Sequence, residues 1–309
     1  MDRQFIVIPH IRVTGANALN SLYSAGFPAM TAFLGFGHTL ERNIHGLQVT
    51  GVGVVVHQSE FQAVRDGYSR TWALKAKKFP LVKARSQSYP GEAVSDSFQV
   101  RAYVDLDVSL IFECSDIPTD ARDSVMKSIE ENLYRTRLAG GDITSFRKPK
   151  AFFCSSDDDV CWQEQNALCR KMMRSIMPGF ALVERRDIMD SLAKDGKGDA
   201  LDRIMYATSA DAIPEQGSKE KTAYRFERHF KGWLLPLAVG FHDLSGSVTV
   251  KGQRSYDAEH HFAEPLLTLC EFRMPHRFES VDNILWHYKY DAGQHSYLCV
   301  NSDFHTEKE

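Results

Sequence analysis

The sequence lacks the features of a membrane protein or a secreted protein. Its longest mostly apolar run, Trp233–Phe241, is far shorter than the roughly 20 residues that a membrane-spanning helix needs. The N-terminus shows no signal-peptide pattern, because an acid, Asp2, is followed at once by a strand-like stretch. We therefore expect a cytoplasmic globular protein. The 309 residues, of which 43% are hydrophobic and 25% charged, are enough to bury a sizeable core.

Closely spaced cysteine pairs are also missing. None of the six cysteines has Cys-x-x-Cys spacing, and zinc ligands usually come in tighter pairs than Cys154, Cys161 and Cys169. His260 and His261 are adjacent, so they point to different sides of a strand or helix. The sequence has no zincin, serine-hydrolase, Walker or dinucleotide motif. It therefore predicts buried free thiols, no disulfide, no metal and no cofactor.

A strong net charge is absent too, but the average hides a basic segment. The formal charge of −3 and the pI of about 6.5 argue mildly against nucleic acid as a partner. Residues 61–90 nevertheless hold seven basic residues and one acid, so they carry +6 and the rest of the chain −9. The basic residues are Arg65, Arg70, Lys75, Lys77, Lys78, Lys83 and Arg85, and Tyr68, Trp72, Phe79 and Tyr89 lie among them. Cations beside stackable rings suit single-stranded nucleic acid, although a solvated basic loop without a ligand is the alternative.

Hydrophobic periodicity predicts an α+β fold in the first half of the chain. A short strand ends at Pro9, and a helix capped by Thr119 occupies residues 119–134. The segment 100–112 alternates strictly, which indicates a strand with one buried face and one wet or functional face. The predicted strands are 5–8, 47–57, 100–112 and part of 142–154, with helices at 29–44 and 119–134. This β-α-β-β-α-β order is typical of the ferredoxin-like arrangement, found in the RRM and RAMP folds.

The connection between the second and third predicted strands is too long for a simple hairpin. It spans about 40 residues where a few would suffice, so an inserted functional element, a thumb at about 60–96, is expected there. Residues 1–155 would form the core that carries it. Residues 156–309 are predicted to be a helical segment followed by a mixed α/β assembly region. Its expected parts are helices at 160–176 and 187–207, a polar linker at 212–221, and strand-like segments at 232–241, 266–272, 283–290 and 296–300.

A glycine pair follows the second predicted helix. Gly140 and Gly141 come shortly after Arg135 and Arg137. Two glycines allow a backbone to approach a ligand closely, and the arginines add positive charge, so the loop could hold a phosphate or an unstacked base. A helix C-cap explains one glycine equally well. The spacing leaves both interpretations open.

An ordered set of short motifs resembles one known family over nearly the whole chain. The motifs are Ile8–Arg12, Ala16–Ala18 with Ser21, Gly26–Ala29, Ala32–Phe36 with His38, Arg137–Gly141, Pro178–Val183, Gly232–Leu234 with Pro236, Pro275–Arg277 and Leu285–Trp286. Together they closely resemble the Csy-two family, the Cas-five-type subunit of type I-F CRISPR surveillance (Cascade) complexes.

The resemblance implies a non-catalytic subunit that grips the 5′ handle of the crRNA. It also implies a heterodimer with the large Cas-eight-type subunit, contact with the adjacent Cas-seven-type backbone subunit, and a position near target DNA beside the protospacer-adjacent motif. Motif residues, the basic insertion and the glycine loop supply the expected RNA-binding residues. These are Arg12, Asn17, Ser21, Phe27, Arg70, Lys75, Lys77, Lys78, Lys83, Arg85, Arg135, Arg137, Gly140 and Gly141.

Two alternative functions are compatible with the same fold. The first is a metal-free endoribonuclease that processes precursor crRNA, with His38 on the first helix as the base that takes the 2′-OH proton. No second histidine or tyrosine is obviously positioned by spacing to protonate the leaving oxygen. The second is a subunit whose basic thumb mainly holds target DNA.

Overall fold

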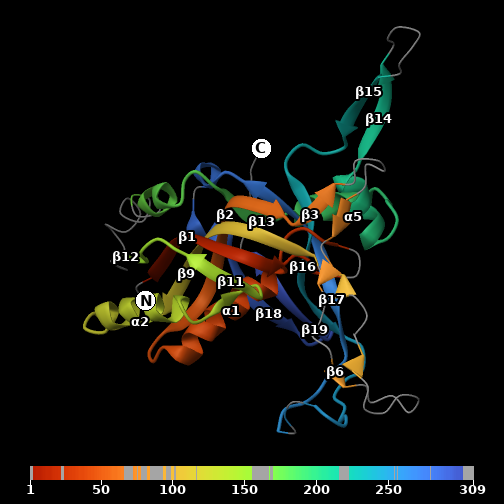
Figure 1. The fold of residues 1–309 in the computed structure, drawn as a ribbon. Helices are drawn as coiled ribbons and strands as arrows, with labels where there is room; N and C mark the ends of the chain where they lie inside the picture. Colours follow the sequence, from red (N-terminus) through yellow and green to blue (C-terminus); the bar gives the residue numbers. More distant parts are fainter. Residues whose placement is uncertain are drawn as a thin grey trace.

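The structure, a computed structural model, is an α+β protein built on one large antiparallel sheet of eleven strands (Figure 1). It describes residues 3–21, 24–65, 72–74, 76–77, 82–83, 93–94, 99–100, 102–115, 117–154, 167, 170–215, 223–253, 255, 257–278 and 280–301. The predicted α+β class is confirmed. Within these residues, no helix combines the length and the apolar character needed to cross a bilayer.

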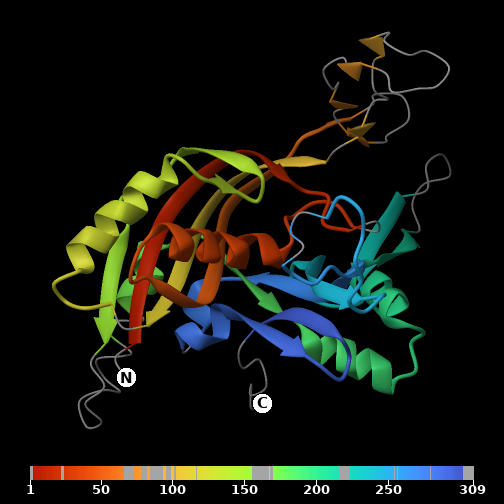
Figure 2. The same ribbon diagram turned by 90° about the horizontal axis from the view of Figure 1, so that it is seen from below.

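The first half of the chain forms one side of this sheet. Its elements are β1 (Arg3–Asn17), α1 (Met30–Asn43), β2 (Gln48–Phe61), β9 (Tyr103–Ser115), α2 (Arg122–Leu133), β11 (Gly141–Ser145) and β12 (Lys150–Cys154). β9 lies between β1 and β2 and is antiparallel to both, while β11 and β12 pair with the other edge of β1. Helices α1 and α2 lie over the same face of these strands (Figure 2).

The alternation predicted for β9 is confirmed over most of its length. Val104, Leu106 and Val108 are buried under the helices, while Asp105 and Asp107 lie on the other face and are only partly covered. From Ser109 to Phe112 both faces of β9 are buried. The reason is a second core cluster, in which residues from 170–176 and 281–285 pack against that end of the sheet.

The prediction that the first strand ends at Pro9 is wrong. β1 continues to Asn17, and Pro9 sits where the pairing with β9 shifts register between Ile8 and Ile11. Proline cannot donate to a regular ladder, but it is tolerated at such a bulge. The strand therefore passes through the proline.

The second half of the chain completes the sheet and closes part of it on itself. The strand path runs from β2 through β13, β17, β16, β19 and β18, and β18 pairs again with β2, so these six strands form a ring. Both halves of the chain therefore share one sheet. The added strands are β13 (Phe180–Glu184), β16 (Leu234–Asp243), β17 (Ala263–Arg273), β18 (Leu285–Asp291) and β19 (Ser296–Asn301). The last four confirm the predicted strand-like segments, whereas β13 was not predicted.

Three local predictions in helices and linkers are corrected. The helix expected at 187–207 is two helices, α4 (Arg186–Lys194) and α5 (Ala200–Thr208), because Gly196 and Gly198 between them have φ of +69° and +54°. Helix α2 has Ala121 rather than Thr119 at its N-cap. The supposed linker at 212–221 begins inside a strand, β14 (Ala210–Glu215), which pairs with β15 (Ala223–Arg228) and projects from the body in Figure 1.

The segment between β2 and β9 contains short antiparallel pairs. β3 pairs with β4, β5 with β8 and β6 with β7. The β6–β7 pair lies within the segment that the β5–β8 pair closes, as in one longer hairpin. They lie beyond the ends of β2 and β9 (Figure 2). Their bounds are β3 Ala63–Arg65, β4 Trp72–Leu74, β5 Ala76–Lys77, β6 Val82–Lys83, β7 Ala93–Val94 and β8 Gln99–Val100.

The described cysteine side chains are buried free thiols, as predicted. Cys114, Cys270 and Cys299 have no disulfide partner. Burial raises the pKa of Cys114 and of Cys299 to about 12, so both thiols stay protonated at neutral pH. The side chains of the cysteines at 154, 161 and 169 lie outside the described residues.

Trp286 should be a main determinant of stability where the sheet closes. Its side chain is fully buried and its indole N–H donates to the carbonyl of Leu182 on β13 at 2.9 Å. Trp286→Phe removes this donor and leaves a cavity, so we expect a loss of roughly 2–4 kcal/mol in the free energy of unfolding, measured with urea. Trp233→Phe is the control, because Trp233 is 58% exposed, and it should cost less than about 1 kcal/mol. Equal losses in both variants would contradict this role.

Candidate functional site

A groove of about 630 Å³ joins distant parts of the chain beside α1. It is lined by the end of β1, the start of α1, the glycine loop, and residues of β16, β18 and β19. Three of the residues predicted to bind RNA meet here: Asn17, Arg137 and Gly140. The volume lies within the roughly 300–1,000 Å³ of typical ligand sites.

The glycine loop is a tight β-hairpin turn and not a helix cap. Arg137–Leu138 form β10, which pairs with β11 across the two-residue turn Ala139-Gly140. Both turn residues have positive φ, 50° and 78°, as a type I′ hairpin requires. The C-cap interpretation is therefore wrong, because α2 has already ended at Leu133.

Gly141 is required by close packing against β1. A Cβ at this position would lie 2.6 Å from Cγ1 of Val13 and 2.7 Å from the backbone nitrogen of Ala16. The N–H of Asn17 donates to the carbonyl of Ala139 at 2.9 Å and ties the turn to the end of β1. At Gly140, by contrast, the space that a Cβ would occupy is open. The close approach predicted for the pair is therefore made to β1 at Gly141, and Gly140 faces the groove.

Arg137 carries the positive charge at this rim of the groove. Its Nε donates to the carboxylate of Asp142 at 2.9 Å, and both side chains are more than 70% exposed. Exposed pairs of this kind contribute only about 0–1 kcal/mol, so Arg137 can exchange this partner for a phosphate at little cost. Arg135 is exposed in the link between α2 and β10.

The start of α1 forms another wall. Pro28, Ala29, Thr31 and Ala32 line the groove there. Within this described helix, no side chain caps the N-terminus and no acid occupies the first turn. The partial positive charge of the helix N-terminus is therefore not neutralised locally, which favours an anion in the groove.

Aromatic rings from the second half of the chain complete the groove. Tyr288 and Tyr297 stack with their centroids 4.7 Å apart, and Phe241 also lines the site. Burial raises the pKa of both tyrosines, so their phenols stay protonated at neutral pH. His38 packs on Tyr288 with 4.8 Å between ring centroids, and its Nε2 lies 3.9 Å from a carboxylate oxygen of Glu41.

Three other predicted residues of the first half lie outside the groove lining. Arg12 is exposed on β1, with Nε 3.7 Å from Asp107. Ser21 is buried, and its hydroxyl accepts the backbone N–H of Ser24 within a turn. Phe27 is buried between the rings of Phe33 and Phe272, so its ring is part of the core.

The predicted basic residues of the insertion are described only in part. Lys77 and Lys83 belong to β5 and β6, but their side chains lie outside the described residues. Arg70, Lys75, Lys78 and Arg85 lie outside the described residues entirely. Their role therefore stays a prediction.

Sequence reasoning missed the aromatic side of the groove. Tyr288, Tyr297 and Phe241 lie in segments that were correctly predicted as strands, but strand periodicity does not reveal which strand will lie beside α1. Their position depends on β18 returning to β2.

The chain is similar to known CRISPR-associated proteins over nearly its whole length. A family model described as CRISPR-associated protein (Cas_Csy2) matches residues 6–299, which places the chain among the CRISPR-associated proteins. A curated relative, "CRISPR-associated protein Csy2" of Pseudomonas aeruginosa (strain UCBPP-PA14), is 26% identical over 307 residues, covering 92% of this chain and 90% of that protein. The chain belongs to the Csy2 family, and the resemblance to a subunit of the type I-F Csy complex is confirmed.

The two glycines should differ in their effect on stability. Gly141→Ala forces a Cβ against the backbone of β1, so we expect a loss of about 1–3 kcal/mol in the free energy of unfolding. Gly140→Asn is the matched control, since asparagine tolerates a positive φ and the site is open, and it should cost less than about 1 kcal/mol. Chemical denaturation of both variants measures the difference. The reverse order of effects would contradict the packing role of Gly141.

Proposed function

We propose that this protein is a non-catalytic subunit of a type I-F CRISPR effector and that the groove holds the 5′ handle of the crRNA. The observation that carries the proposal is the meeting of Asn17, Arg137 and Gly140 in one groove with the start of α1 and stacked tyrosines. Asn17 comes from one motif and Arg137 with Gly140 from another, more than a hundred residues further along the chain.

The fold of the first half supports an RNA-binding role. The strand order β12–β1–β9–β2, with α1 and α2 over one face, follows the order expected for a ferredoxin-like core at 1–155. We propose that this core, with its thumb at about 60–96, is the RNA-binding part. The remainder, 156–309, would serve mainly as assembly surface and supplies one wall of the groove.

The two sides of the groove differ in chemistry. Arg137 and the first turn of α1 favour a phosphate, because one offers a charged N–H donor and the other a positive helix end. Tyr288, Tyr297 and Phe241 offer ring faces and, from the tyrosines, protonated hydroxyl donors. Phosphate contacts on one side and stacking on the other are how unpaired RNA is usually held.

Further contacts follow from membership of the family. We propose that the chain pairs with the large Cas-eight-type subunit and that its thumb reaches the adjacent Cas-seven-type subunit. The basic residues of the thumb would hold crRNA, and target DNA beside the protospacer-adjacent motif is the other ligand their charge could serve. A cytoplasmic location accords with this role.

Arg137→Glu should weaken binding of handle RNA. Loss of a charge-assisted contact and the new repulsion should raise the Kd by about 10- to 100-fold at fixed salt, because such a bond contributes about 1.5–3 kcal/mol. Fluorescence anisotropy with a labelled handle oligonucleotide measures the change. Lys127→Glu is the matched control, since Lys127 is exposed on α2 and is not part of the groove lining. If both variants bound RNA equally weakly, the change in net charge alone would explain the effect. That result would contradict binding of the handle in the groove.

Incubation with precursor crRNA at neutral pH should give no site-specific cleavage. A metal-free nuclease needs an acid as well as a base, and Tyr288, which packs on His38, is a poor proton donor because burial raises its pKa. The measurement is a denaturing gel of end-labelled RNA, with His38→Ala in parallel. Cleavage at one site that disappears in His38→Ala would establish the nuclease function instead.

A further inference from the structure

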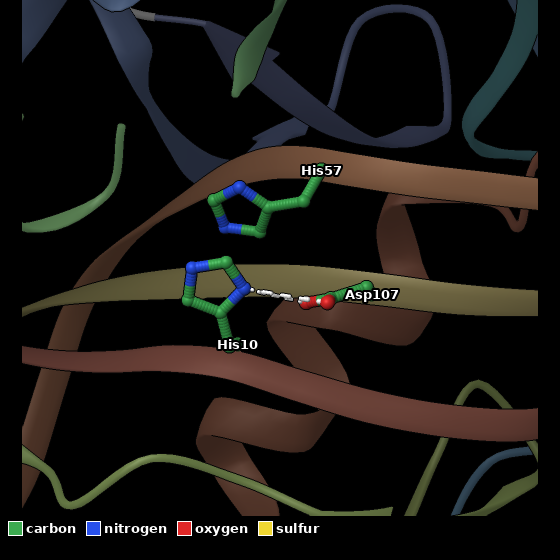
Figure 3. Close-up of side chains that lie close together, drawn as sticks. All are labelled: His10, His57 and Asp107. Atoms are coloured by element: carbon green, nitrogen blue, oxygen red, sulfur yellow. Dashed lines mark hydrogen bonds and ion pairs between the residues drawn. The ribbon is translucent and has the colours of Figure 1, made fainter. Parts of the chain in front are cut away.

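Three side chains with metal-binding atoms meet on the sheet face away from α1 and α2. His10 comes from β1, His57 from β2 and Asp107 from β9, which lies between those strands. Figure 3 shows the two imidazole rings one above the other, with Asp107 beside His10. The ring centroids are 3.9 Å apart, and one ligand atom from each residue lies within 4.8 Å of the others.

Irregular backbone on both sides of β9 brings the two histidines together. The β1–β9 pairing shifts register between Ile8 and Ile11, and the β2–β9 pairing shifts between Val56 and Gln58. Each histidine therefore lies within a bulge. His10 also has φ of +50°, which non-glycine residues rarely adopt. Bulges re-aim side chains, and such strain concentrates at functional sites.

The hydrogen bonds assign a lone pair to Nε2 of His57. Its Nδ1 lies 2.5 Å from the carbonyl of Pro178, which can only accept, so Nδ1 carries the proton. Nε2 then accepts a hydrogen bond from the hydroxyl of Ser109 at 2.6 Å. The same hydroxyl oxygen accepts the backbone N–H of His10 at 3.0 Å. Burial lowers the pKa of His57, so this neutral form persists at neutral pH.

His10 is oriented in a similar way. Its Nδ1 lies 3.0 Å and 3.3 Å from the two carboxylate oxygens of Asp107. A histidine whose other nitrogen donates to a carbonyl or carboxylate is the usual form of a metal ligand, because the partner fixes the tautomer and raises the basicity of the free nitrogen. His57 meets this condition through the carbonyl of Pro178, and an ion at Nε2 takes the place of the Ser109 hydroxyl. Asp107 gives up its contact with His10 when it becomes a ligand itself.

We propose that His10, His57 and Asp107 form a binding site for a divalent first-row transition metal ion such as Zn²⁺. Imidazole and carboxylate groups suit this class of ion. Stacked parallel rings cannot aim both lone pairs at one ion, so binding turns the ring of His10 out of the stack while Pro178 holds His57. The sequence predicted no metal site, because the ligands come from three separate strands and have no motif spacing.

The neighbouring charges set the expected affinity. The guanidinium of Arg12, whose Nε lies 3.7 Å from Asp107, competes with a cation for that carboxylate. The positive charge of Arg147 also disfavours a cation at His57. Arg12 is 69% exposed, so it can move away at little cost. A carboxylate in the centre of the cluster disfavours the alternative ligand for this surface, a phosphate group.

The test uses the untagged full-length chain titrated with Co²⁺ and then with competing Zn²⁺. Saturable visible absorption from one Co²⁺ per chain, displaced by Zn²⁺, is expected. His57→Gln and Asp107→Asn should each weaken Co²⁺ binding at least about tenfold. Arg12→Ala should tighten binding several-fold, because it removes the competing cation.

His261→Gln is the matched control. His261 is an exposed histidine with two carboxylates beside it, Asp243 at 2.8 Å and Glu259 at 3.4 Å, and its replacement should leave Co²⁺ affinity unchanged. Absence of saturable binding would overturn the site, and so would a loss of binding in His261→Gln. Far-UV circular dichroism checks the folding of each variant. If a cluster variant does not fold, the surface variant Arg12→Ala decides, because unchanged or weaker binding there contradicts the proposal.

Discussion

The rest of the structure depends on the pairing of β9 with β1 on one edge and β2 on the other. Because side chains alternate along a strand, β9 can bury Val104, Leu106 and Val108 under α1 and α2 only if it turns Asp105 and Asp107 to the opposite face. The free edge of β1 then receives β11 and β12, while the free edge of β2 receives β13 and β18. One strand thus separates two surfaces of different chemistry.

Both surfaces arise where regular pairing stops. The groove lies at the end of β1, where a tight turn is held against the strand because Gly141 has no side chain. Its other wall exists because β18 returns to β2 and brings Tyr288 beside α1. On the opposite face, two bulges bring His10 and His57 over β9. The bulges and the tight turn supply polar groups that can bind a ligand, and the regularly paired strands β16, β18 and β19 supply the aromatic rings of the groove.

Much of the fold could be predicted from periodicity, and the failures have physical causes. Helix α1 and the C-terminal strands follow their hydrophobic patterns closely. Pro9 was taken as a strand end because a regular ladder excludes proline, but a bulge removes that conflict. The split between α4 and α5 depends on Gly196 and Gly198, whose positive φ the helical pattern around them conceals. Phe27 was assigned to RNA from its motif, whereas packing against Phe33 and Phe272 places it in the core.

The sequence by itself determined the Csy2 family, the α+β class and the alternation of β9. The family follows from the order of short motifs along the chain, and the alternation of β9 follows from local geometry, because successive side chains of a strand point to opposite faces. Only the tertiary structure decided that the glycines form a hairpin turn, that the two tyrosines face Asn17 and Arg137, and that His10, His57 and Asp107 meet. Those outcomes depend on which strands pair and in what register, and residues far apart in the chain determine this together.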